Sequence, residues 1–340
     1  MRQSFGERFD VPDGYLNTAS IGIPSASAGE AVAAAVAGWR SGAGRAGEYD
    51  EYVERARAGF AALVGLGADR VATGPAVSAL VGLVAAALPA GARVLVAGGE
   101  FTSVTWPFAA QADRGVTVTE VDLAQVGPRA AEFDLVAVSV VQSADGRLVD
   151  LDGLRAARGS GTRVLLDATQ SLGWLDADLS WADAVVAAGY KWLLSPRGVA
   201  WMAVGPELAA TPVAAGWFAG ADRWAQIYGL PMTLAPDARR LDTSPAWYCH
   251  VGAAVALPWL AGLDRSAVHT HCVGLADSFR AGLGMEPAGS AIVSVTRDGA
   301  GERLAAAGVV SAARAGAARL AFHLYNTEAD VARALDALTP

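Results

Sequence analysis

Cysteine and lysine are scarce in this chain, and clustered charges are missing. The two cysteines among 340 residues, Cys249 and Cys272, are too few for a disulfide framework and fit a reducing compartment. There are 26 basic and 34 acidic residues, a formal charge of −8, and no block of basic residues stands out. This composition disfavours binding to nucleic acid or to an anionic membrane. The charged start of the chain lacks the apolar stretch of an export signal, so we expect a cytoplasmic protein.

Long uncharged apolar runs are rare, and the one worth weighing as a membrane span covers residues 71–92. Pro75 and Pro89 interrupt it, which favours a strand end followed by a buried helix over a membrane span. Apolar residues make up 53% of the chain and charged residues 18%, enough for a large buried core. At this length we expect one large α/β domain with a smaller one, or two comparable domains.

Lysine occurs once, at Lys191, and the remaining basic residues are all arginines. Arginine cannot become a neutral amine near pH 7, because its pKa lies above about 12. A desolvated lysine can lose its proton and form a Schiff base with a carbonyl compound. Residues 187–194 are apolar and follow the strand-like residues 184–186, so burial is expected to lower the pKa of Lys191. The alternative is a lysine retained by chance on a solvated face.

Short β-rich runs alternate with helical patterns up to about residue 205, which predicts a mostly parallel sheet covered by helices. The expected strands of this part are residues 71–73, 93–97, 116–121, 135–141, 163–167, 183–187 and 199–204. Its expected helices are residues 27–39, 48–66, 77–88, 103–114 and 151–159. Residues 206–245 are irregular. Helices at 245–263 and 265–283 then lead to strands at 292–296, 309–313 and 319–322 and to a helix beginning with a capping box at Thr327.

Three segments at strand ends complement the lysine. Asp167 ends an apolar strand 24 residues before Lys191, where a carboxylate can pair with a pyridinium nitrogen, although Asp also caps turns. Residues 73–78 join a strand to a helix and offer backbone N–H groups for a phosphate. Phe101 follows the next strand and could stack on a flat cofactor or pack in a core. Ligands of parallel sheets bind beyond the carboxyl ends of the strands, where these groups are expected to meet.

These motifs resemble the class V aminotransferase family of fold-type I pyridoxal-phosphate enzymes, which includes cysteine desulfurases and kynureninases. The resemblance spans nearly the whole chain and is most specific at residues 167–170 and 189–192. It implies an α/β fold with a large domain, residues 16–245, built on a mostly parallel seven-stranded sheet. Residues 246–340, joined by residues 1–15, would form a small C-terminal α+β domain.

The resemblance also implies roles for individual residues. Lys191 would bind pyridoxal 5'-phosphate as a Schiff base and carry the Cα proton, and Asp167 would pair with the ring nitrogen. The other cofactor-binding residues would be Val77, Ser78, Phe101, Ser103, Gln170 and Tyr190, with Trp217 and Ser244 reaching the partner subunit's cofactor in a homodimer. Asn17 and Arg319 would bind the substrate, Arg319 by its carboxylate.

Some residues depart from the family pattern. Cys249 and Cys272 lie in predicted helices rather than on a mobile loop, which disfavours sulfur transfer through a persulfide. Gln170 stands where many members have a histidine, and residues 216–218 lack the histidine that follows them in kynureninases. His269 and His271 would point to different helix faces, so no metal site is expected. The aromatic residues of 217–248 could line an apolar pocket or a dimer interface.

The sequence thus predicts a pyridoxal-phosphate enzyme that acts on a free amino acid or a small amine. We favour a lyase that breaks a C–S or Cβ–Cγ bond, because kynureninase-like features outnumber those of transaminases. A class V aminotransferase, an amino-acid epimerase and a catalytically silent cofactor-binding protein are the alternatives, because one carbanion can react in several ways.

Overall fold

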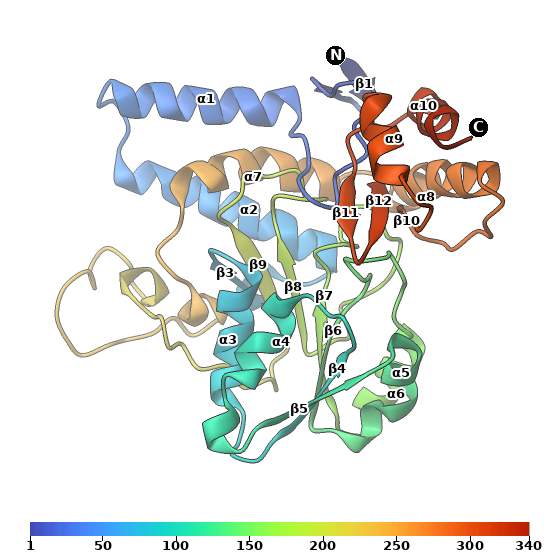
Figure 1. The fold of residues 1–340 in the computed structure, drawn as a ribbon. Coiled ribbons are helices and arrows are strands. Elements are labelled where there is room, and N and C mark those ends of the chain that lie inside the picture. The colour runs from blue at the N-terminus through green and yellow to red at the C-terminus, as the bar shows by residue number, and fades with distance from the viewer. Residues whose placement is uncertain (340) are drawn as a thin grey trace.

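A seven-stranded sheet forms the centre of the computed structural model, which describes residues 1–339 (Figure 1). Its strands are β3 (Val71–Gly74), β4 (Arg93–Ala97), β5 (Thr117–Val121), β6 (Leu135–Ser139), β7 (Arg163–Asp167), β8 (Ala184–Ala188) and β9 (Ala200–Val204). They lie in the order β3-β9-β8-β7-β6-β4-β5, and only β9 runs antiparallel to its neighbours. This confirms the mostly parallel sheet expected from the alternating pattern.

Helices cover both faces of this sheet. They are α2 (Tyr49–Val64), α3 (Val77–Ala87), α4 (Thr102–Ala109), α5 (Leu123–Arg129), α6 (Leu151–Gly159) and α7 (Trp247–Ala261). Helix α1 (Ala26–Arg40) packs on α7, outside this layer (Figure 1). In β4, Val94 packs in the core beneath α3 and α4, whereas Leu95 packs in the opposite core with α2, α5, α6 and α7. Because both faces are buried, the strands appear in the sequence as continuous apolar runs.

A three-stranded antiparallel sheet forms the C-terminal part, with β10 (Ile292–Val295), β11 (Ala312–Arg314) and β12 (Ala317–Ala321) in the order β10-β12-β11. The helices α8 (Arg265–Gly282), α9 (Ala300–Ala306) and α10 (Glu328–Leu338) pack on one of its faces. The capping box expected at Thr327 is present, with Asp330 as its second member. The fold is thus the fold-type I arrangement predicted from the sequence.

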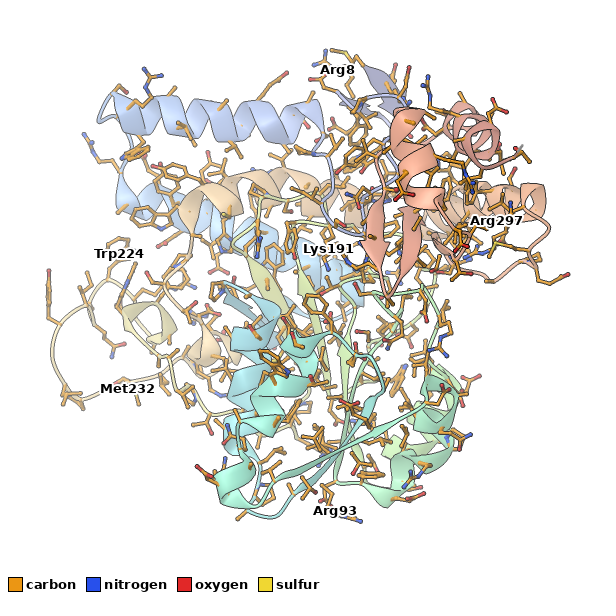
Figure 2. All side chains as sticks on the ribbon, in the orientation of Figure 1. Arg8, Arg93, Lys191, Trp224, Met232 and Arg297 are labelled. Carbon is orange, nitrogen blue, oxygen red and sulfur yellow. The ribbon has the colours of Figure 1, made fainter. Side chains whose placement is uncertain are left out.

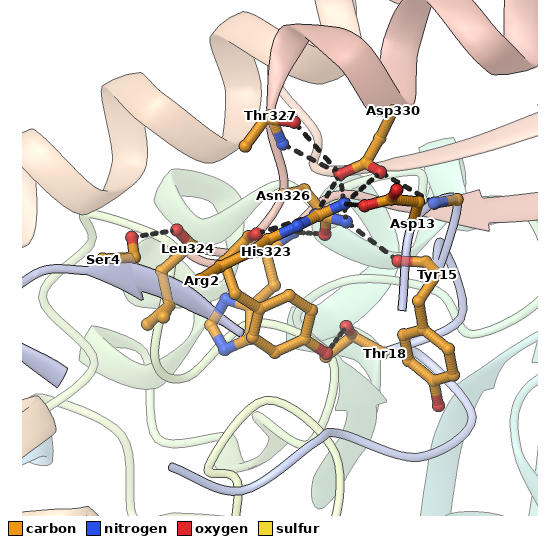
Figure 3. Close-up of polar contacts among 12 residues, drawn as sticks. Arg2, Ser4, Asp13, Tyr15, Thr18, His323, Leu324, Asn326, Thr327 and Asp330 are labelled. Carbon is orange, nitrogen blue, oxygen red and sulfur yellow. Dashed lines mark hydrogen bonds and ion pairs between the residues drawn. The ribbon is translucent and has the colours of Figure 1, made fainter. Parts of the chain in front are cut away.

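The start of the chain is joined to this C-terminal part (Figure 3). Strands β1 (Arg2–Ser4) and β2 (Glu7–Phe9) form a hairpin, and the Arg2 guanidinium donates to Asp330 at 2.5 and 2.9 Å. The Asn326 amide donates to the Tyr15 carbonyl at 2.8 Å. Helix α7, however, lies along α2 of the large sheet's helical layer (Figure 1). The domain boundary between residues 245 and 246 stays a prediction.

Most expected elements occur within a few residues of their predicted ends, and two differences have local causes. The helix expected at 103–114 ends at Ala109; it contains Pro107, which has no N–H to donate, and a 3-10 turn follows at Ala112–Arg114. The strand expected at 309–313 begins at Ala312, because Val310 instead pairs with Tyr15. The short elements β1, β2, α5 and α9 were not predicted. Among residues 1–339, no helix has both the length and the apolar character needed to cross a membrane.

The irregular segment 206–245 leaves the body of the molecule as a long loop, on which Figure 2 labels Trp224 and Met232. Its end is anchored by the buried Asp242, which accepts from Arg57 at 2.7 Å and from the Thr73 amide at 2.8 Å. Farther out, Tyr228 and Leu230 are 92% and 90% exposed. The loop therefore combines a fixed base with an apolar tip that packs on little else.

Candidate active site

A cavity of about 300 Å³ opens at the carboxyl ends of the parallel strands. The segments after β3, β4, β6, β7 and β8 line it, together with the residues before β9. Since β9 runs antiparallel to the others, its start lies at the same edge of the sheet as their ends. The lining residues are Pro75, Ala76, Val77, Ser78, Phe101, Ser103, Ser139, Ser143, Asp167, Thr169, Gln170, Ala188, Tyr190, Lys191, Arg197, Gly198 and Val199.

Lys191 lies three residues beyond the end of β8 and is only 6% exposed. Its Nζ lies 5.2 Å from the centre of the Phe101 ring and 5.6 Å from that of Tyr190. Burial lowers the pKa of Lys191 to about 8; the Asp167 charge opposes this shift, and nearby arginines add to it. About a tenth of this side chain is therefore a neutral amine at pH 7, far more than for an ordinary lysine.

Asp167 is the last residue of β7 and lies buried in the cavity wall. Its Oδ1 accepts from the Thr169 amide at 2.8 Å. Burial raises the pKa of Asp167 to about 6, the hydrogen bonds from Thr169 oppose this shift, and the Glu100 charge contributes to it. Such a carboxylate gains from a cationic partner in the cavity, because a positive charge favours its ionised form.

Glu100 was not predicted as a site residue, yet its carboxylate orders one wall of the cavity. It accepts from the amide and hydroxyl of Ser139, at 2.7 and 2.5 Å, and from the Gln142 amide at 3.0 Å. These bonds join the turn before α4 to the end of β6. Glu100 therefore fixes the position of Phe101, which is 47% exposed at the cavity mouth.

Ser143 connects the residues expected to contact the cofactor with those expected to bind the substrate. Its hydroxyl lies 3.0 Å from Nε2 of Gln170 and 3.1 Å from Nη1 of Arg319. Gln170 also donates to the Ala19 carbonyl at 3.0 Å and accepts from the indole of Trp192 at 2.7 Å. The Gln170 amide thus has three hydrogen-bond partners, of which Ser143 also lines the cavity.

Arg319 is 1% exposed and has no carboxylate partner among residues 1–339. Its guanidinium donates to the Ser143 carbonyl at 2.5 Å and to the Ser20 hydroxyl at 2.7 Å, while its Nε has no hydrogen-bond partner. Burial lowers the pKa of Arg319 to about 10, and the charge of Arg314 adds to this shift. A buried cation without a counter-ion is unfavourable, so this position favours an anionic ligand.

The opposite end of the cavity combines a helix N-terminus with polar side chains. Helix α3 begins at Val77, and its N-cap residue, Ala76, has no side chain that could cap the first backbone N–H groups. Ser78 and Tyr190 line the same end, and the Arg197 guanidinium lies 5.3 Å above the Tyr190 ring. Free amides, hydroxyl groups and an arginine together are suited to bind a phosphate group.

Four predicted site residues do not line this cavity: Arg319, which lies behind Ser143, and Asn17, Trp217 and Ser244. Trp217 packs on Phe218 and Trp224, with ring centres 5.2 and 5.1 Å apart, at the base of the 206–245 loop. Ser244 is exposed just before α7. Asn17 pairs with Ala321, and its side-chain oxygen is buried without a hydrogen-bond partner. The predicted roles of Trp217 and Ser244 require a second subunit.

The aromatic residues of 217–248 do not line the cavity either. They form two groups: one around Trp217, and one in which Trp247 stacks on Tyr49 with ring centres 4.9 Å apart. Trp217 and Tyr228 instead line a separate pocket of about 440 Å³ within the 206–245 loop, so both the pocket and the dimer interface remain predictions for these residues.

The two thiols and the two histidines of α8 do not line the cavity, although the Cys249 thiol donates to the carbonyl of Arg197, a lining residue, at 3.2 Å. Cys249 is half-buried in α7 and Cys272 is buried in α8; burial raises the pKa of both thiols. Both are therefore poor nucleophiles. His269 contacts the Asp176 amide, whereas His271 contacts the Asn326 carbonyl, so the two rings have different neighbours.

Sequence reasoning missed Ser139, Ser143, Thr169 and Arg197, all of which line the cavity. Thr169 and Arg197 each lie within six residues of a predicted site residue, so proximity to Asp167 and Lys191 was the available signal. Ser143 carried no such signal, because a serine in a loop after a strand usually marks only a turn.

The chain matches the family model described as aminotransferase class-V over residues 32–298. It is 30% identical over 312 residues to the uncharacterized aminotransferase YcbU of Bacillus subtilis (strain 168), covering 84% of this chain and 83% of that protein. It is 29% identical over 240 residues to the isopenicillin N epimerase of Streptomyces clavuligerus, covering 61% of this chain and 56% of that protein.

Solved structures with a similar fold have lower sequence identity. The Escherichia coli cysteine desulfurase CsdA has a TM-score of 0.81 at 19% identity, with 97% of this chain and 96% of that chain covered. The cystine C–S lyase C-DES, in complex with its product cysteine persulfide, has a TM-score of 0.83 at 19% identity, with 96% and 97% covered. At this level of identity the likeness establishes the fold alone.

Proposed function

The chain belongs to the class V aminotransferase family of pyridoxal-phosphate enzymes, and we propose that it is a lyase that breaks a C–S or Cβ–Cγ bond of a free amino acid. One observation carries the proposal. A buried amine, Lys191, lines one cavity together with Ser143 and Gln170, and a buried arginine without a carboxylate partner, Arg319, donates to Ser143 from behind this wall. An amino acid supplies what this arrangement lacks, an anion for Arg319 and an acidic Cα–H for the amine.

Pyridoxal phosphate is the cofactor, and the cavity residues fit it. Asp167 has partners only on Thr169 among the described residues and is suited to pair with the ring nitrogen. Lys191 would hold the aldehyde carbon, and Phe101 would cover the ring. The uncapped start of α3, with Val77, Ser78, Tyr190 and Arg197, would hold the phosphate, and Ser103 and Gln170 would contribute from the sides. When bound, the protonated ring accepts the electron pair left at Cα.

The chain's own groups then have distinct tasks. Arg319 binds the α-carboxylate with its planar fork and fixes the orientation of the Cα–H bond. Lys191, with a pKa of about 8, accepts this proton as a neutral amine and can return it to the product or the leaving group. Asp167 keeps its charge next to the ring nitrogen and holds that nitrogen protonated. Asn17, near β12, would contact the substrate.

Two features support elimination as the outcome. The half-exposed Phe101 leaves the cavity mouth open for a substituent on Cβ. The raised pKa values of Cys249 and Cys272 disfavour the thiolate that a desulfurase needs. The same fold also serves a cystine C–S lyase, C-DES.

Amino transfer is the second candidate, and the relative YcbU, an aminotransferase by name, favours it. Epimerisation has support from the weaker similarity to isopenicillin N epimerase. All three outcomes use the residues described above and differ in where the proton or the leaving group goes.

Product analysis tests the proposal. The purified protein with pyridoxal phosphate is incubated with β-substituted L-amino acids, with and without a 2-oxo acid. A lyase releases pyruvate or alanine without the 2-oxo acid, whereas strict dependence on it identifies an aminotransferase. Inversion of the configuration at Cα, with no cleavage product and no 2-oxo acid consumed, identifies an epimerase. Lys191→Ala is expected to abolish product formation, and Arg303→Gln, on the distant helix α9, serves as a charge-matched control.

A homodimer would complete the site. Trp217 and Ser244 lie outside the chain's own cavity, and the nearby loop carries the exposed Tyr228 and Leu230. Aromatic and apolar side chains of this kind are enriched at subunit interfaces. Light scattering is expected to give the mass of two chains. The two free thiols fit a cytoplasmic location, which fractionation of cells would test.

A further inference from the structure

The small sheet carries a second arginine on the same face as Arg319. In the antiparallel pair of β11 and β12, Ala312 lies opposite Arg319 and Arg314 lies opposite Ala317. Side chains alternate along a strand, so Arg314, Ala317 and Arg319 share one face. Arg314 and Arg319 are diagonal neighbours, with Cα atoms roughly 7–8 Å apart by the usual sheet geometry.

This face is directed at the active site. Arg319 contacts Ser143 and Ser20, whereas the alternate residues Ala318 and Leu320 pack on the other face with α8, α9 and α10. Arg314 ends β11 at the hairpin turn, next to Ala315 with a φ of 46°. In Figure 1 this hairpin extends from the small sheet toward the carboxyl ends of the large one. Its tip therefore lies toward the same edge of the large sheet as the cavity, although no residue of the tip lines the cavity itself.

Arg314 has no acidic partner within residues 1–339. Its guanidinium is exposed and donates only to the carbonyl of the adjacent Ala313, at 2.7 Å. Some exposed arginines of the chain pair with acids, such as Arg129 with Glu132 at 2.9 Å, whereas others, such as Arg303, have no ion pair among the described residues. The Arg314 charge lies close enough to lower the pKa of both Lys191 and Arg319. Two neighbouring cations without an acid between them repel each other, and a bound anion would relieve this repulsion.

One carboxylate cannot serve both arginines equally. The α-carboxylate is placed by the buried Arg319, next to Ser143 and Gln170, and Arg314 lies farther out toward solvent. We propose that Arg314 binds a second anionic group of the substrate, a carboxylate on its side chain or on its leaving group. Substrates would then be dianionic amino acids, held by the buried Arg319 next to the cavity and by Arg314 farther out toward solvent. The inference rests on the proposed function in taking Arg319 as the α-carboxylate site.

Binding of unreactive acids to the cofactor-loaded protein tests this inference. Glutarate and its monoamide, glutaramate, have almost the same shape and differ by one negative charge; adipate and adipamate form a longer pair. None has an amine, so none can react with the cofactor. Titration calorimetry is expected to show at least one dicarboxylate binding about tenfold more tightly than its monoamide, because a charge-assisted hydrogen bond is lost in the amide.

Three variants separate the possible results. Arg314→Gln is expected to remove the tenfold preference while changing monoamide affinity less than about twofold. Arg303→Gln removes the same charge from α9, on the other face of the small sheet, and is expected to keep the preference. Arg319→Met is expected to weaken both members of each pair.

The outcomes distinguish the inference from the proposed function. Equal affinity of the wild-type protein for both members of each pair would overturn the role of Arg314. So would an Arg314→Gln variant that keeps the preference or weakens both members equally. If Arg319→Met leaves both affinities unchanged, or if no acid binds the wild-type protein, the α-carboxylate site itself is refuted, and the proposed function with it.

Discussion

Replacing Arg319 with methionine should separate activity from stability. The methionine side chain keeps much of the volume but cannot bind the substrate carboxylate. Losing one partner of a buried, hydrogen-bonded charge pair typically costs about 2–5 kcal/mol. We therefore expect kcat/KM of the Arg319→Met variant to fall by roughly 30- to 5,000-fold.

The stability of the substrate-free protein should change little. Burial lowers the pKa of Arg319 to about 10, well below its ordinary value, so burying this charge destabilises the fold by a few kcal/mol, on the order of 1.4 kcal/mol for each pH unit by which the pKa falls. The guanidinium also donates to Ser143 and Ser20, and each such bond contributes about 1 kcal/mol. These effects nearly cancel, so the free energy of unfolding should stay within about 1–2 kcal/mol of the wild-type value.

The assay combines steady-state kinetics on a β-substituted amino acid with urea unfolding of the same samples. Arg319→Lys retains the charge but not the fork and is expected to recover part of the activity. An Arg319→Met variant with unchanged kcat/KM would refute the assignment of the carboxylate site. A variant that loses activity only because it unfolds would refute the view that this arginine serves ligand binding more than stability.

Four further predictions concern Lys191, the thiols and the dimer. Capture of pyridoxal phosphate by the cofactor-free protein should accelerate with a midpoint near pH 8 and level off above pH 9, where Lys191 is neutral; a rate still rising at pH 10 contradicts its lowered pKa. Because Lys191 binds its proton more tightly in the unfolded chain than in the folded one, the free energy of unfolding should rise between about pH 8 and 10.5. Lys191→Met should abolish this rise in denaturant titrations. Cys249→Ser combined with Cys272→Ala should keep kcat within about twofold, since neither thiol lines the cavity and serine keeps a donor for the Arg197 carbonyl; loss of product in the folded variant would indicate thiol chemistry. If Trp217 serves the partner's cofactor, mixing inactive Lys191→Ala and Trp217→Ala subunits should restore activity, whereas no recovery in mixed dimers would exclude that role.

The cavity wall formed by strand ends was predictable from the sequence. Asp167 ends a short apolar strand, and Gln170 and Lys191 each lie shortly after one. Parallel strands bring their carboxyl ends to one edge of the sheet. Lys191 was detectable from composition alone, because it is the only lysine and all remaining basic residues are arginines. Arg319 required the motif around it, since an arginine on a strand is more often a surface residue.

Other features depended on information that no local pattern holds. Ser143 is important through its distance to two residues far along the chain, Gln170 and Arg319. The shared face of Arg314 and Arg319 follows from the pairing register of β11 and β12. This register could not be predicted, because the expected strand, residues 309–313, ends before Arg314. The predicted contact of Trp217 with a cofactor depends on a second chain, because within its own chain Trp217 packs only on loop residues such as Phe218 and Trp224.

Borohydride reduction tests the central claim that Lys191 carries the cofactor in this cavity. The protein is incubated with pyridoxal phosphate, its visible spectrum is recorded before and after reduction, and the attachment site is located by peptide mass spectrometry. The account predicts a visible band that disappears on reduction and leaves the cofactor fixed at Lys191, the chain's sole lysine. A protein that stays colourless, or a Lys191→Ala variant that forms the same reducible adduct, would contradict it.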